Sequence, residues 1–80
     1  MDAKGAVAAR ITELCKNEKL TVNALANLAG MSSSTIYSML NAKSQNPGVI
    51  SLQKICDALD ISMREFFDSP LFENLDAIIQ

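Results

Sequence analysis

Hydrophobic positions in residues 20–43 form two short helical stripes with a glycine between them. The first stripe follows Thr21, whose hydroxyl can cap a helix start, and it stops at Gly30, a residue that readily adopts the left-handed conformation of a helix end. The second includes Ile36 and follows a run of hydroxyl residues that can cap another helix. The pattern therefore predicts two short helices joined by a tight turn, the second running from about Ser33 to Asn41.

Apolar stripes of the same period flank this pair and predict three further helices. They run from about residue 3 to 18, from about 49 to 59, and over a short segment after Ser62, which forms a capping-box pattern with Glu65. The residues expected on the buried faces of these helices are Val7, Ile11, Leu14, Cys15, Val49, Leu52, Ile55, Cys56, Leu59, Met63, Phe66 and Phe67. Five short helices predict a compact all-α domain over residues 1–68.

A final segment, residues 69–80, carries more apolar side chains than a solvated tail needs. Ser69 and Pro70 are typical of a helix start, and the residues after them predict a helix over 70–80. Its apolar stripe consists of Leu71, Phe72, Leu75, Ile78 and Ile79. So wide a stripe needs a partner, either the domain's own core or another subunit, and dimerisation is the slightly favoured expectation.

Composition limits the chain to one small domain without evident catalytic chemistry. Eighty residues allow one core, and no apolar run approaches the roughly 18 residues that span a bilayer, so a cytoplasmic location is expected. Histidine is absent, and the two cysteines, Cys15 and Cys56, lie far apart on apolar stripes. We therefore expect reduced thiols in the core, no metal, no cofactor and no enzymatic activity.

Charge is distributed unevenly along the chain. The net charge is −2, which weighs against a nucleic-acid partner, since such binding depends largely on cations facing phosphate. Residues 1–56, however, have a net charge of +3 from six cations and three anions, whereas residues 57–80 have a net charge of −5 from one cation and six anions. Among the cations, Arg10 can meet Glu13 or a phosphate, and an exposed side chain without a bound partner is the expected state.

The second helix of the central pair is apolar on one side and polar on the other. Its polar side carries Ser33, Ser34, Tyr37 and Ser38. A helix pair with so short a turn has the geometry by which a recognition helix enters the major groove of DNA. Without further information, a serine-rich helix start is more often only a cap.

Over about residues 7–67 the chain resembles the lambda-repressor-like, Cro-type helix-turn-helix family of bacterial and phage DNA-binding domains. The resemblance rests on an ordered set of residues: Leu20-Thr21, Leu25-Ala26, Leu28-Ala29-Gly30, Ser32, Ser34-Thr35-Ile36, Asn41, Asn46-Pro47, Leu52, Ile55, Leu59 and Ile61-Ser62. It implies that residues 33–41 form the recognition helix. Residues implied to face bases or the nearby backbone are Ser33, Ser34, Thr35, Tyr37 and Ser38, and those implied to face phosphates are Thr21, Asn41, Lys43 and Ser44.

The chain departs from the family pattern at positions that bear on affinity. Val22 stands where many relatives have Gln, which removes a usual phosphate contact. Ala42 replaces a usual Gly, so the left-handed residue after the recognition helix is expected at Asn41. The recognition helix itself contains no Arg or Lys.

Two functions follow from these observations. The leading hypothesis is a sequence-specific regulator of transcription that binds double-stranded DNA, a repressor occupying its operator as a homodimer. The alternative is a protein-interaction module, like an antitoxin or an anti-repressor, that uses the same fold with weak or no DNA binding.

Overall fold

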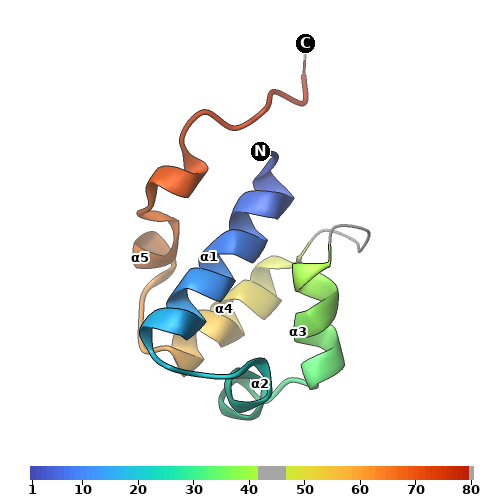
Figure 1. Ribbon diagram of the computed structural model, residues 1–80, viewed down its shortest axis with the longest axis vertical. Coiled ribbons are helices and arrows are strands. Elements are labelled where there is room, and N and C mark those ends of the chain that lie inside the picture. The colour runs from blue at the N-terminus through green and yellow to red at the C-terminus, as the bar shows by residue number, and fades with distance from the viewer. Residues whose placement is uncertain (42–46, 80) are drawn as a thin grey trace.

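The computed structural model describes residues 1–41 and 47–79, and all of its regular elements are helices (Figure 1). In chain order these are α1 (Ala3–Asn17), α2 (Val22–Ala29), α3 (Ser33–Leu40), α4 (Val49–Ala58), α5 (Met63–Phe67) and the 3-10 helix η1 (Pro70–Phe72). The predicted all-α class and its five helices are confirmed. In Figure 1, α1 lies between α5 and α3, and α2 crosses one end of the domain.

Side-chain caps set the starts of α2, α3 and α5, as the sequence predicts. The Thr21 hydroxyl accepts the backbone N–H of Ala24 at 3.1 Å, and Ser32 begins α3 in the same way. Gly30 ends α2 with a φ of 65°, the left-handed geometry that favours glycine. The capping box of Ser62 and Glu65 is formed at the start of α5.

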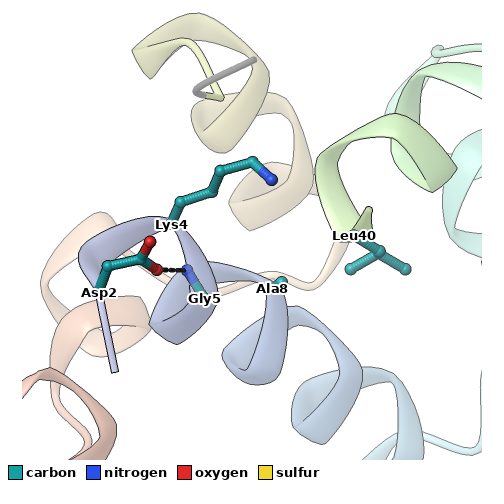
Figure 2. Close-up of a pocket in the computed structure, with 5 residues that line it drawn as sticks. All are labelled: Asp2, Lys4, Gly5, Ala8 and Leu40. Atoms are coloured by element: carbon teal, nitrogen blue, oxygen red, sulfur yellow. Dashed lines mark hydrogen bonds between the residues drawn. The ribbon is translucent and has the colours of Figure 1, made fainter. Parts of the chain in front are cut away.

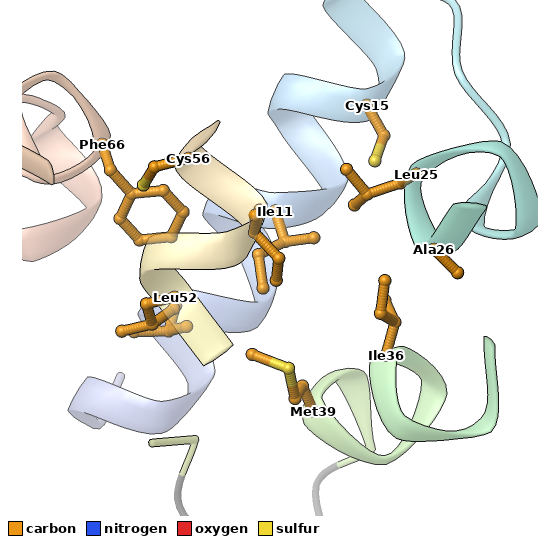
Figure 3. Close-up of a cluster of buried hydrophobic side chains, with 11 residues drawn as sticks. Ile11, Cys15, Leu25, Ala26, Ile36, Met39, Leu52, Cys56 and Phe66 are labelled. Atoms are coloured by element: carbon orange, nitrogen blue, oxygen red, sulfur yellow. The ribbon is translucent and has the colours of Figure 1, made fainter. Parts of the chain in front are cut away.

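One fully buried side chain from each α-helix meets at the centre of the domain. These five residues have no exposed surface: Ile11, Leu25, Ile36, Ile55 and Phe66. Figure 3 shows side chains of this cluster converging from all five helices. Cys15 and Cys56 are buried in the same core as free thiols, as expected. Because every helix contributes, the position of α3 depends on the whole core.

Three predictions about the flanking helices are wrong. Phe67, expected on a buried face, is 41% exposed, because α5 turns Phe66 into the core. Val49, expected to be buried, is 69% exposed, because α4 buries its later residues Leu52 and Ile55 instead. Arg10, expected to be exposed and unpaired, has a side chain that is only 14% exposed and forms an ion pair with Glu13.

Arg10 joins α1 to the end of α5. Its Nε donates to the carbonyl of Phe66 at 2.7 Å, and its Nη2 donates to the carbonyl of Glu65 at 2.8 Å. The last carbonyls of a helix lack partners within the helix and attract cations. Arg10 thus has a structural role, in which it ties α1 to the end of α5.

The C-terminal segment forms a helix only briefly. Ser69 and Pro70 start it as predicted, but η1 has three residues and residues 73–79 are not helical. Phe72 packs against Phe67 with ring centroids 4.9 Å apart. The prediction of a helix continuing beyond Phe72 is wrong, because a segment of this length is a marginal helix unless it packs against something.

Beyond Phe72 the chain returns toward the N-terminus as an extended tail (Figure 1). The backbone N–H of Asp76 donates to the carbonyl of Met1 at 3.1 Å, and its carboxylate lies 3.3 Å from the Met1 amine. Ile78 and Ile79 are 87% and 91% exposed. These two side chains therefore add almost nothing to the core.

Candidate nucleic-acid interface

A tight turn sets α3 beside α2. The N–H of Gly30 donates to the carbonyl of Asn27 at 3.3 Å, and the N–H of Met31 donates to that of Ala26 at 2.9 Å. Met31 packs partly buried against the core, and Ser32 then begins α3. Only three residues lie between the two helices, so the direction of α3 is closely determined by α2.

The two faces of α3 differ as the sequence predicts. Ile36 and Met39 are buried and hold the helix against the core. The opposite face presents Tyr37, which is 55% exposed, and Ser38, which is also exposed. α3 thus offers solvent a surface of small hydroxyl groups and one aromatic ring, a suitable shape and chemistry for the edges of bases in a major groove.

A cluster of hydroxyl groups fixes the first turn of α3. The Ser32 Oγ accepts the Thr35 N–H at 3.2 Å and lies 2.7 Å from the Thr35 Oγ1 and 3.2 Å from the Ser34 Oγ. Ser34 and Thr35 are exposed, while Ser33 is half-buried. A hydroxyl can donate once and accept twice, so hydroxyls held in this way keep capacity for a further hydrogen bond.

The residues implied to face phosphates lie at helix ends. Thr21 is exposed at the start of α2, and Asn41 is exposed directly after α3. The expected left-handed geometry at Asn41 is wrong, since its φ of −84° and ψ of 128° are extended. Lys43 and Ser44 fall within residues 42–46, outside the part of the chain that the structure describes.

One cation that no sequence pattern predicts lies near the end of α3. Lys4, in the first turn of α1, donates a hydrogen bond from Nζ to the backbone carbonyl of Asn41. The two residues are 37 positions apart, and no local pattern links them. Only the packing of α1 beside α3 brings them together.

The thiols of Cys15 and Cys56 are poorly placed to act as nucleophiles. Burial raises the pKa of the Cys15 thiol, and burial together with the charge of Asp57 raises the pKa of the Cys56 thiol. Both groups are therefore protonated, weakly nucleophilic core side chains near neutral pH.

Residues 1–41 and 47–79 contain neither a cluster of metal ligands nor a membrane-spanning helix. Nowhere in these ranges do three His, Cys, Asp or Glu side chains come together as ligands of a metal ion. None of the described helices combines the length and apolar character of a membrane span.

Comparison with known proteins agrees with this geometry. Residues 10–70 match the model of the Cro/C1-type HTH DNA-binding domain. The chain therefore belongs to the Cro/C1-type helix-turn-helix family, a family of DNA-binding regulators. No curated protein sequence matched the chain.

Two solved structures are similar over most of their length. The crystal structure of prophage Lp1 protein 11 superposes with a TM-score of 0.80 at 35% identity, covering 88% of this chain and 93% of the other. The restriction-modification controller protein C.AhdI from Aeromonas hydrophila gives a TM-score of 0.72 at 28% identity, covering 80% of this chain and 96% of the other.

Proposed function

We propose that this protein represses transcription by occupying an operator as a homodimer, with α3 in the major groove. The observation that carries the proposal is the exposed polar face of α3, which the buried Ile36 and Met39 hold outward from the core. Membership of a DNA-binding family supports it, as does the likeness to a protein described as a restriction-modification controller.

In this proposal the site residues have two roles. Hydroxyls on α3 and the Tyr37 ring read base edges or the adjacent backbone; these residues are Ser33, Ser34, Thr35, Tyr37 and Ser38. A second group positions the domain on phosphates; these residues are Thr21, Asn41, Lys43 and Ser44. Few of these groups are cations, so we expect a shallow dependence of affinity on salt.

The site itself provides a test with contrasting substitutions. On a duplex selected from a random pool, Ser34→Ala should weaken binding by about 1 to 3 kcal/mol at one base position and leave unrelated DNA unaffected. Lys43→Ala should weaken binding to all duplexes alike and lower the salt slope by about one unit. Titrations at several salt concentrations measure both effects. Failure of the wild type to bind any duplex at low salt overturns the proposal.

A homodimer is proposed because one recognition helix buries too little surface for tight specific binding. Exposed apolar side chains are available on α4 and on the tail: Val49, Ile50, Ile78 and Ile79. Ile78 also lines an apolar groove with Val7 and Leu52. We propose that the second subunit covers this surface.

Sedimentation of three chains tests where the subunits meet. The full chain should be a dimer, a chain ending at Ala77 should dissociate at concentrations where the full chain does not, and Leu28→Asp should be unchanged. Leu28 is a suitable control because it is also exposed and apolar, at 60%, but lies on α2. If the shortened chain dimerises as well as the full one, the interface lies elsewhere.

A protein-interaction module is the second candidate function. The absence of Lys and Arg from α3 and the net charge of −5 in residues 57–80 favour it. A gel shift with mixed genomic fragments at low salt separates the candidates, since the module would bind the fragments weakly or not at all.

A further inference from the structure

Different contacts hold the two ends of α3. The N-terminal end, at Ser33 to Thr35, follows the short turn from α2 and is fixed by the hydroxyl cluster around Ser32. The last turn of α3 contains no basic residue that could interact with the negative end of the helix dipole. Lys4 of α1 supplies a cation there and donates to the carbonyl of Asn41.

The start of α1 is built so that Lys4 has a defined position. The Asp2 carboxylate accepts the N–H of Gly5 at 2.7 Å and so caps the helix. A Cβ at Gly5 would lie only 2.9 Å from the Asp2 Oδ1, which shows how closely this first turn is packed. Lys4 lies in this capped first turn and is half-buried.

The side chain spans the gap between the two helices. Figure 2 shows Lys4 extending from the first turn of α1, on the side where α3 ends at Leu40. A cavity of about 110 Å³ lies between the helices and is lined by Asp2, Lys4, Gly5, Ala8 and Leu40. In this last turn of α3, Leu40 is half-buried beside the buried Met39, and the bond from Lys4 adds a polar contact to their apolar packing.

We propose that Lys4 is a positioning residue for DNA recognition, which holds the C-terminal end of α3 at the angle required for specific base contacts. The inference rests on the proposed DNA-binding function of α3. Tyr37 and Ser38 are in the half of α3 nearer to Lys4, whereas Ser33 and Ser34 are in the half fixed by Ser32. Loss of Lys4 therefore impairs readout by Tyr37 and Ser38 more than readout by the first turn.

The test compares Lys4→Met with Lys4→Arg and with a control, Lys54→Met. The Met side chain keeps much of the apolar stem but cannot donate, whereas Arg retains a charged donor. Lys54→Met removes the same charge from an exposed position of α4. Affinity is measured on a selected site, on all its single-base variants and on unrelated duplex, at several salt concentrations.

For Lys4→Met we expect affinity for the selected site to fall about three- to tenfold, the effect of losing one charge-assisted hydrogen bond near the surface. Affinity for unrelated duplex and the salt slope should match those of Lys54→Met, and Lys4→Arg should restore most of the specific affinity. The preference for one base over the others should weaken mainly at the positions read by Tyr37 and Ser38.

Two outcomes would overturn the proposal. An equal loss of affinity on all duplexes, with a salt slope lower by about one unit, would mean that Lys4 contacts phosphate directly. Unchanged specific affinity would also overturn it.

Hydrogen exchange without DNA separates failure of this inference from failure of the proposed function. In Lys4→Met the amides of Leu40 and Asn41 should exchange several-fold faster, while that of Thr35 keeps its wild-type rate. If exchange at the end of α3 is unaltered, Lys4 does not hold it. If exchange changes as expected but the wild type binds no DNA, Lys4 does hold the end of α3 and only the proposed function fails.

Discussion

Helix α3 and the C-terminal residues 73–79 both contain apolar side chains in a pattern that predicts a helix, but only α3 is helical. In α3, Ile36 and Met39 enter a core to which four other helices contribute. In the tail, Ile78 and Ile79 remain almost fully exposed. Short helices are marginal in water, so tertiary packing decides which of two similar patterns becomes a helix.

Helix α3 is also attached to the rest of the domain more firmly than the tail is. α3 is capped at its start by Ser32, and Lys4 bonds to the residue after its end. Apart from the packing around Phe72, the tail is held near Met1 by the backbone hydrogen bond and exposed ion pair of Asp76. Exposed ion pairs contribute about 0 to 1 kcal/mol, so the tail can detach at little cost to the domain.

Matched isoleucine substitutions should give the largest contrast. Ile36→Ala should lower the free energy of unfolding by about 2 to 5 kcal/mol, because it leaves a cavity at a fully buried position. Ile79→Ala, at an exposed position, should change it by less than about 0.5 kcal/mol. Urea denaturation of both variants measures the difference. Similar losses at the two sites would show that the tail packs like α3.

The boundary between core and tail should fall at Phe72. Phe72→Ala should cost about 2 kcal/mol, less than a fully buried phenylalanine, because its half-buried ring contacts Phe66 and Phe67. A chain ending at Ala77 should unfold with wild-type stability in dilute solution, where dimerisation is absent. The comparison is made by thermal and urea melts. A larger loss from the truncation than from Phe72→Ala would contradict this boundary.

Substitutions of the serine caps of α3 and η1 sharpen the contrast between these two helices. Ser32→Ala should destabilise the domain by about 1 kcal/mol, since it removes the cap of α3 and the anchor of the hydroxyl cluster. Ser69→Ala removes the cap of a three-residue helix, and its cost should be a few tenths of a kcal/mol. Equal effects in urea melts would mean that η1 is as strongly coupled to the fold as α3.

The smallest effect should be a loss of stability at alkaline pH that originates in the core. The pKa values of Cys15 and Cys56 are raised in the folded protein, so the unfolded chain loses these protons at lower pH. The thiols' contribution to stability is therefore complete below the ordinary pKa of 9.0 and is lost as pH rises through the folded values. As pH rises from 8 to 10, the urea concentration at the midpoint of unfolding should fall more for the wild type than for Cys15→Ala. Parallel curves would contradict this assignment.

Much of the fold was predictable because its signals are local. The caps at Thr21, Ser32 and Ser62 act on a backbone N–H three residues away, and Gly30 ends a helix through its own φ. The polar face of α3 was predictable for the same reason, since burial of Ile36 and Met39 leaves Tyr37 and Ser38 on the other side. The assignment of these residues to DNA contacts stays a prediction.

Positions that depend on distant partners were decided only by the tertiary structure. The partners of Arg10 on α5 are 55 and 56 residues away, and the partner of Lys4 is 37 residues away, so neither pair leaves a periodic signal. Val49 and Ile79 fit apolar stripes, yet the core is already filled by Leu52, Ile55 and Phe66.

The sequence by itself determined where helices α1 to α5 start and which face of α3 is polar, because capping and amphipathic spacing act within a few residues. The tertiary structure decided which cations tie helices together and that the tail stays extended, because these depend on which surfaces remain free after five helices have packed.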